Sequence, residues 1–313
     1  MCCLYGIIDC NHVLSVKQKN RLISALATAA EVKGTDATGI AYNSDGKLRI
    51  YKRPIPAHFM RFHIPGDAGI ITGHTRMTTQ GSACKNRNNH PFSGYVDHQP
   101  FALAHNGVIY NDDDLRRQWN LPTPKIETDS FVAVQLIEKK KSLSPSSLKF
   151  MAEQLRGSFT ITVLDSSDTL SIIKGDNPLC LYHYPRAGIY VYASTKEILN
   201  RALKRCPVPA GKPVSVDIAD GDILQIGADG TISRSRFDKT HLLHGLSSPF
   251  WGCCEYEDYQ LPMYLRRKER SYLDELKSVA MSFGYTPENI DHLASQGFTP
   301  EEIEEFLYGF GEV

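Results

Sequence analysis

The residue with the most distinctive chemistry is Cys2, which directly follows the initiator methionine. A small second residue permits removal of Met1, which would leave a thiol and a free α-amine on the same residue. The amine has a pKa near about 7.7–8 and the thiol near about 8.5, so the amine can take the proton of its own side chain. Such a residue is a nucleophile with a built-in base, suited to attack on a carbonyl carbon.

Two other interpretations of Cys2 remain open from the sequence. The thiol could be a small hydrophobic side chain at the start of a buried strand. Alternatively, Cys2 and Cys3 could be acylated as a membrane anchor. No basic cluster lies nearby to support an anchor, and residues 4–8 have the pattern of a core strand.

Cys2 is followed by motifs that mix glycine with polar side chains. In chain order the six motifs are Cys2-Cys3-Leu4-Tyr5-Gly6-Ile7, Lys33-Gly34-Thr35-Asp36-Ala37-Thr38-Gly39-Ile40, Gly73-His74-Thr75-Arg76-Met77-Thr78-Thr79-Gln80-Gly81, Asn89-His90-Pro91-Phe92, Ala104-His105-Asn106-Gly107-Val108-Ile109-Tyr110-Asn111 and Glu127-Thr128-Asp129-Ser130. Together they resemble the class II glutamine amidotransferase domain of the N-terminal-nucleophile hydrolases. The resemblance covers roughly residues 2–226. It is strongest to the glutaminase domains of glucosamine-6-phosphate synthase and glutamine phosphoribosylpyrophosphate amidotransferase.

The resemblance implies that Cys2 attacks the side-chain amide of free L-glutamine and forms a thioester. Attack creates an oxyanion, which needs hydrogen-bond donors aimed at it. The family motif assigns these donors to the side-chain amide of Asn106 and the backbone N–H of Gly107. The products would be glutamate and ammonia, and no cofactor is expected.

The resemblance also implies which residues recognise the substrate. Arg76 would bind the α-carboxylate in a bidentate manner, Asp129 would bind the α-ammonium, and Thr79 would be a further substrate-binding residue. Read without the family, Arg76 could form a surface ion pair and Asp129 could be the N-cap of the helix that follows it. The Asn106-Gly107 pair could likewise be a hairpin turn.

Several positions depart from the family pattern. Cys3 replaces the usual glycine, Met77 and Gln80 stand where the synthase type has Trp and His, and Phe131 replaces an acidic residue. In the family the loop around Arg76 closes over glutamine, so Met77 would form a softer lid than Trp. We expect three histidines near the site to be structural rather than general bases: His74, His90 and His105.

The elements that must position these residues alternate between short apolar strands and amphipathic helices. Strands are predicted at 4–8, 39–43, 48–52, 68–74, 101–105, 158–164, 170–174, 179–184, 189–194, 213–217 and 222–226, and helices at 16–31, 129–139, 145–155 and 196–203. The turn signals Ser44-Asp45-Gly46 and Ala228-Asp229-Gly230 predict hairpins and antiparallel neighbours. The family implies the fold class α+β, a four-layer αββα sandwich, with a small all-α C-terminal segment.

Three segments are predicted along the chain: an amidotransferase domain at 1–238, a connector or strap at 239–270 and a small helical module at 271–313. In the last segment Gly284-Tyr285-Thr286-Pro287-Glu288 recurs thirteen residues later as Gly297-Phe298-Thr299-Pro300-Glu301, which predicts short capped helices. This module could pack on itself or on the main domain, or it could dock an acceptor enzyme.

Composition excludes some classes of function. The 35 Lys and Arg residues balance the 35 Asp and Glu residues, so no net charge attracts nucleic acid, and no apolar run approaches the length of a membrane span. Eight cysteines spread over 313 residues indicate a reducing, cytoplasmic location. The expected partners are free L-glutamine and a separate ammonia-acceptor enzyme. The alternatives are an amide hydrolase or acyl transferase with another substrate, and a catalytically silent binding module.

Overall fold

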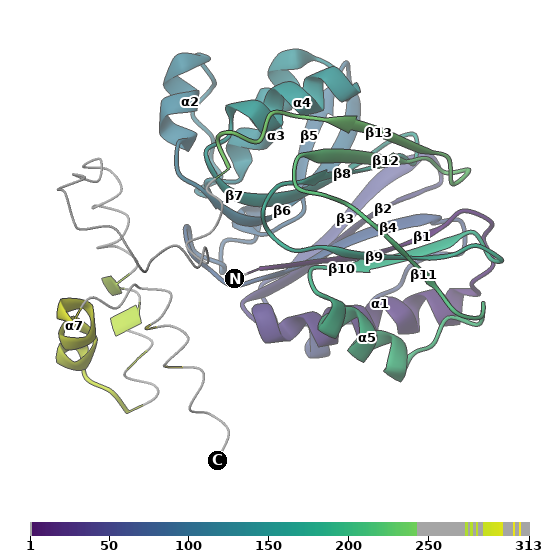
Figure 1. The fold of residues 1–313 in the computed structure, drawn as a ribbon, viewed down its shortest axis with the longest axis horizontal. Coiled ribbons are helices and arrows are strands. Elements are labelled where there is room, and N and C mark those ends of the chain that lie inside the picture. The colour runs from purple at the N-terminus through teal and green to yellow at the C-terminus, as the bar shows by residue number, and fades with distance from the viewer. Residues whose placement is uncertain are drawn as a thin grey trace. The chain divides into compact units, whose positions relative to one another are not determined.

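Two antiparallel sheets lie face to face in the N-terminal part of the chain (Figure 1). The computed structural model describes residues 2–242, 273–274, 276–277, 280, 284–296, 303 and 307. It divides into two compact units, residues 1–248 and 249–313, and each is described by itself.

The first sheet has seven strands in the order β11-β9-β10-β1-β4-β2-β3. Their bounds are β1 Cys3–Asp9, β2 Ala37–Ser44, β3 Lys47–Arg53, β4 Ile70–Arg76, β9 Cys180–Tyr184, β10 Ile189–Ala193 and β11 Val214–Val216. The second sheet has six strands in the order β13-β12-β8-β7-β6-β5. Their bounds are β5 Phe92–Val96, β6 Gln99–Ile109, β7 Gly157–Asp165, β8 Leu170–Lys174, β12 Asp222–Ile226 and β13 Ile232–Arg236.

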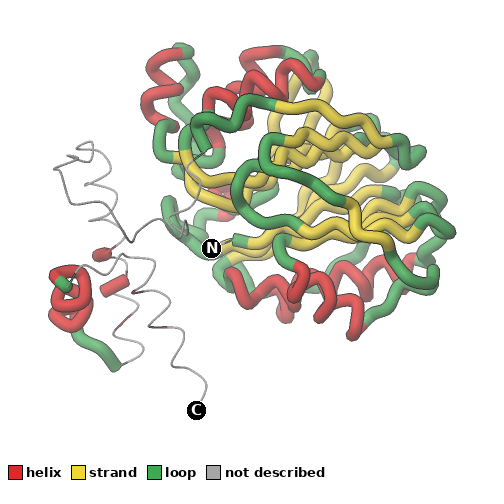
Figure 2. Tube along the Cα trace, in the orientation of Figure 1, coloured by secondary structure: helices red, strands yellow, loops and turns green. Residues whose placement is uncertain are grey.

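Helices cover the outer face of each sheet, as the tube in Figure 2 shows. The bounds are α1 Val16–Ala30, α2 Asp112–Gln118, α3 Phe131–Lys140, α4 Pro145–Gln154 and α5 Lys196–Arg205. Helices α1 and α5 pack on the first sheet, and α3 and α4 pack on the second. A third buried cluster fills the space between the sheets. The predicted four-layer αββα sandwich is therefore confirmed.

Alternation along β1 divides its side chains between two layers of core. Tyr5 and Ile7 pack toward α1, whereas Leu4 and Ile8 pack between the sheets. Cys2 immediately precedes this strand, so the same alternation places it on the side of Leu4, which packs between the sheets.

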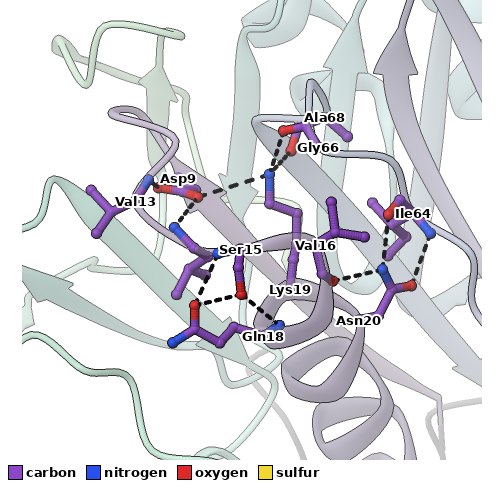
Figure 3. A network of polar contacts seen from close by, with 11 residues as sticks. Asp9, Val13, Ser15, Val16, Gln18, Lys19, Asn20, Ile64, Gly66 and Ala68 are labelled. Carbon is purple, nitrogen blue, oxygen red and sulfur yellow. Dashed lines mark hydrogen bonds and ion pairs between the residues drawn. The ribbon is translucent and has the colours of Figure 1, made fainter.

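The opposite end of β1 is fixed by a buried ion pair (Figure 3). Lys19 Nζ lies 3.8 Å from Asp9 Oδ2, and both side chains are inaccessible to solvent. Lys19 also donates to the carbonyls of Gly66 and Ala68, while the Asp9 carboxylate accepts from the backbone N–H groups of Val13 and Leu14. Every charged group in this network therefore has several partners, which buried charges require.

The structure adds elements that the sequence pattern did not predict, namely α2, β5 and β13. Each is short or polar: α2 begins with three aspartates, and β13 is mostly exposed. The predicted hairpins are present. The β2–β3 turn has Asp45 and Gly46 at φ values of 51° and 67°, as a two-residue turn between twisted strands requires.

The second unit contains α7, Pro287–Ser295, whose N-cap residue Thr286 forms a capping box with Asn289. Leu276, Ala280, Ile290, Ile303 and Leu307 bury their side chains in one cluster. The second copy of the repeated motif and most of the predicted connector lie outside the described residues. Among the residues that are described, no helix is long and apolar enough to cross a membrane.

Candidate active site

Two of the predicted site residues, Arg76 and Asn106, lie on the strand faces that enclose the space between the sheets. Arg76 ends β4 on the face that carries Thr72 and His74, and both of those side chains hydrogen-bond to the second sheet. Asn106 lies in β6, on the same face as Ala102 and Ala104 of the intersheet core.

The Cys2 thiol is partly exposed and donates a hydrogen bond to the carbonyl of Met77 at 3.4 Å. Burial raises the pKa of the thiol, and the amino terminus, the Met77 contact and Arg76 partly oppose this rise. Asp129 raises the same pKa. The thiol is therefore protonated at rest and needs a base before it can attack a carbonyl.

Arg76 is buried and is held by uncharged groups. Its Nη1 donates to Asn89 Oδ1 at 2.7 Å, and its Nη2 donates to the carbonyls of Gln80 at 2.5 Å and Gly81 at 2.9 Å. Among the described residues no carboxylate forms an ion pair with this guanidinium, so the surface ion pair considered from the sequence is wrong. Burial lowers the pKa of Arg76, while Cys2, Asp36 and Asp129 oppose that shift.

Asp129 is buried in the segment before α3. Its Oδ2 accepts from the backbone N–H of Ile109 at 2.6 Å, and its Oδ1 accepts from the Ser130 hydroxyl at 3.3 Å. Helix α3 begins at Phe131 with Ser130 at the N-cap position, so Asp129 is not the N-cap. Its carboxylate instead ties this segment to the end of β6.

Asn106 and Gly107 lie inside β6 and pair with β7, so the hairpin-turn interpretation is wrong. The Asn106 amide is buried, and its Oδ1 has no hydrogen-bond partner among the described residues. Gly107 has φ +136°, and a Cβ there would lie 1.9 Å from the carbonyl oxygen of Ser158. Only glycine is compatible with this close approach of two strands.

The three histidines are buried in the layer beneath the site. His74 Nε2 contacts the carbonyl of His105 at 3.0 Å, His105 Nδ1 contacts the Ser130 hydroxyl at 2.8 Å, and the His90 ring lies 4.2 Å from the His74 ring. Burial lowers the pKa of all three, that of His74 to about 3. They are neutral near pH 7, as expected for structural histidines. No cluster of three or more His, Cys, Asp or Glu side chains within the described ranges is arranged to hold a metal ion.

The remaining predicted positions have different surroundings. Thr79 is exposed on the loop after β4, and its role in substrate binding stays a prediction. The departures from the family pattern occupy defined places: Cys3 is buried in the core under α1, and the Phe131 ring packs edge-to-face on Phe92 at 5.7 Å. Burial raises the pKa of Cys3 to about 11, so this second thiol is protonated near pH 7.

Three further residues in the site were not assigned a role from the sequence. Asn89 orients Arg76, Ser194 contacts the Asn106 amide, and Asn177 Nδ2 donates to the carbonyl of Asn106 at 3.1 Å. Asn89 belongs to one of the six motifs, and its place in that motif could have indicated a role in the site. Ser194 and Asn177 have no local signal, because their partners are 88 and 71 residues away in the chain.

Comparison with known proteins finds a family match in part of the chain. Residues 74–201 match a family described as a glutamine amidotransferase domain. The chain is 31% identical over 172 residues to a glutamine--fructose-6-phosphate aminotransferase (isomerizing) of Halalkalibacterium halodurans, which covers 52% of this chain and 28% of the relative. A protein of the same name from Oceanobacillus iheyensis is 32% identical over 187 residues, covering 57% and 30%. The match thus spans less than a third of each relative.

Among solved structures, the fold is similar to glutamine phosphoribosylpyrophosphate amidotransferase from B. subtilis, with a TM-score of 0.58 and 20% sequence identity. That likeness covers 75% of this chain and 49% of the other. It supports the two-sheet sandwich, and the sequence matches supply the family. Residues 74–201 therefore match a glutamine amidotransferase domain, and the surrounding two-sheet fold is similar to that of a solved amidotransferase.

Proposed function

We propose that this protein hydrolyses free L-glutamine to glutamate and ammonia through a thioester on Cys2. The observation that carries the proposal is the position of the Cys2 thiol, which lies 3.4 Å from the carbonyl of Met77, the neighbour of Arg76. Both Arg76 and Asp129 affect the pKa of this thiol. The Asn106 amide is linked to β1, the strand that follows Cys2, through Ser194, which also binds Leu4. A nucleophile, an amide donor, a cation and an anion are the groups that recognition and attack of a zwitterionic amide require.

Cys2 acts once Met1 has been removed. Its α-amine takes the thiol proton while the sulfur bonds to the side-chain carbonyl carbon of glutamine. The protonated amine then gives its proton to the leaving nitrogen, which departs as ammonia and leaves a thioester. Water, deprotonated by the same amine, attacks the thioester and releases glutamate and the free thiol. The sum is glutamine and water in, glutamate and ammonia out.

The oxyanion formed in each step is stabilised by the Asn106 Nδ2 group and the Gly107 backbone N–H. Support comes from the burial of the Asn106 amide, because a hydrogen bond to a developing charge is stronger away from water. Deletion of one such donor costs about 10²–10³ in kcat in other enzymes.

Arg76 and Asp129 bind the α-carboxylate and the α-ammonium, so the site selects the free amino acid. Both N–H groups of Arg76 Nη2 donate to the carbonyls of Gln80 and Gly81. A bidentate contact through Nη2 therefore requires this loop to release at least one of those hydrogen bonds. Loop movement is thus coupled to substrate binding.

The ammonia acceptor is on another polypeptide, and the protein acts in the cytoplasm. The relatives named as aminotransferases of fructose-6-phosphate are matched over only 28–30% of their own length, which supports an acceptor apart from this domain. Addition of candidate partner enzymes to an assay of glutamate release from L-glutamine would identify the acceptor.

Glutamate release from free L-glutamine tests the proposal. Cys2→Ala should abolish release, whereas Cys3→Ala, a matched control that removes the neighbouring buried thiol, should retain it. Arg76→Lys should raise KM strongly for glutamine. Release of glutamate by Cys2→Ala at the wild-type rate would contradict the thioester route. If the protein hydrolyses an amide that lacks an α-carboxylate, and Arg76→Lys does not change that rate, the natural substrate is not glutamine.

A further inference from the structure

Ser194 follows β10 directly, and its side chain is fully buried. Its hydroxyl accepts a hydrogen bond from the backbone N–H of Leu4 at 2.9 Å, and its own N–H donates to the carbonyl of Leu4 at 2.9 Å. Both backbone polar groups of Leu4 are thus bound by one residue. Because Leu4 is two residues from Cys2, Ser194 fixes the segment that carries the thiol.

The same hydroxyl also contacts the second sheet. Asn106 Nδ2 donates to Ser194 Oγ at 3.4 Å, while Asn106 Oδ1 has no partner within residues 2–242. This contact therefore sets the rotation of the Asn106 amide. An amide nitrogen carries two N–H groups, so one can be held by Ser194 while the other remains for a ligand.

The main chain of Asn106 is fixed independently of Ser194. It pairs with Thr160 in β7, and its carbonyl accepts from Asn177 Nδ2 at 3.1 Å. Loss of the hydroxyl should therefore release the Asn106 side chain without moving β6. When the hydroxyl is removed, the carbonyl of Leu4 keeps its bond to the Ser194 N–H, but the Leu4 N–H loses its acceptor. The position of Leu4 in the variant must therefore be measured together with that of Asn106.

We propose that Ser194 is a positioning residue that sets the Asn106 amide relative to the Cys2 thiol. The consequence for catalysis rests on the proposed function, whereas the contact itself does not. Since an oxyanion forms only after attack, a displaced donor weakens transition-state binding and leaves binding of the amide substrate nearly unchanged. Ser194 acts through Asn106 and does not contact the reacting atoms.

Kinetics of Ser194→Ala test this role against Ser171→Ala as a matched control. Ser171 is also a buried serine in a strand, and its hydroxyl accepts from Gln225 Nε2 at 3.0 Å, away from the site. Relative to Ser171→Ala, we expect Ser194→Ala to lower kcat for glutamate release by about tenfold or more, with KM changed less than about twofold. Equal kcat values in the two variants would overturn the proposal.

Combination with Asn106→Ala gives a second kinetic test. If Ser194 acts through the amide, Ser194→Ala should have no further effect on kcat in the Asn106→Ala background. Full additivity of the two losses would show an independent effect and contradict the assignment.

Crystal structures of the wild type and Ser194→Ala separate this inference from the proposed function. We expect the Asn106 amide to rotate while the Cα atoms of Leu4 and Asn106 stay in place. An unmoved amide overturns the role of Ser194, whatever the enzyme activity. A rotated amide in a protein that releases no glutamate supports Ser194 as a positioning residue and rejects the glutaminase proposal.

Discussion

Arg76 and Asn89 form a buried hydrogen bond in which Nη1 of the guanidinium donates to Oδ1 of the amide at 2.7 Å. Asn89 Nδ2 in turn donates to the carbonyl of Ala83 at 2.7 Å, which ties Arg76 to the loop after β4. An uncharged amide thus orients the guanidinium, and the positive charge stays available to an anionic ligand.

Replacing Asn89 by Ala should weaken binding of glutamine more than it slows chemistry. A hydrogen bond to a charged group contributes about 1.5–3 kcal/mol, so we expect KM to rise by about tenfold or more, with a smaller change in kcat. Asn11→Ala is the control, since that exposed amide lies beyond the opposite end of β1 and donates to the carbonyl of Ala187. Steady-state kinetics of glutamate release distinguish the two, and equal KM values would contradict the role of Asn89.

Acid should destabilise the protein through His74. Burial, followed by repulsion from Arg76, lowers the pKa of His74 from 6.5 to about 3. Between these pH values the unfolded chain binds more protons than the folded one, so stability falls as pH drops from about 6.5 toward 3, by up to about 1.4 kcal/mol per pH unit from this residue. Urea unfolding at pH 7, 6, 5 and 4 should show a steeper fall for the wild type than for His74→Gln. Parallel curves would contradict this account.

The ion pair between Asp9 and Lys19 should be important for stability because neither side chain reaches solvent. Lys19→Met would leave the Asp9 carboxylate buried without its cation, which we expect to lower the free energy of unfolding by about 3–5 kcal/mol. The double variant Asp9→Asn, Lys19→Met removes both charges and should be less destabilised than Lys19→Met alone. Chemical denaturation measures both, and a double variant at least as unstable as the single would count against the prediction.

The sequence predicted the layers of the fold well, because the strands that build the two cores are apolar and periodic. Strand β1 and helix α1 are examples, with nearly the predicted bounds. Strand β13 was missed because Ile232–Arg236 alternates serine and arginine on an exposed edge, and helix α2 because its first turn consists of aspartates. Edge strands and surface helices bury too little apolar surface to impose a pattern.

Sequence analysis predicted only those site residues that lie within local sequence motifs. Arg76, Asn106 and Asp129 lie in such motifs, and Arg76 and Asp129 both affect the pKa of the Cys2 thiol. Their roles in substrate binding and catalysis stay predictions. Ser194 was read only as the end of a strand. Its contacts with Leu4 and Asn106 depend on strand order and register, which no local pattern specifies.

The most direct test of the central claim is mass spectrometry of the N-terminal peptide after treatment with a diazoketone analogue of L-glutamine. We expect a peptide that begins at Cys2 and carries the adduct on the Cys2 sulfur, and we expect excess L-glutamine to prevent formation of the adduct. Retention of Met1 on the purified protein, or an adduct formed on another residue and not on Cys2, would contradict the central claim.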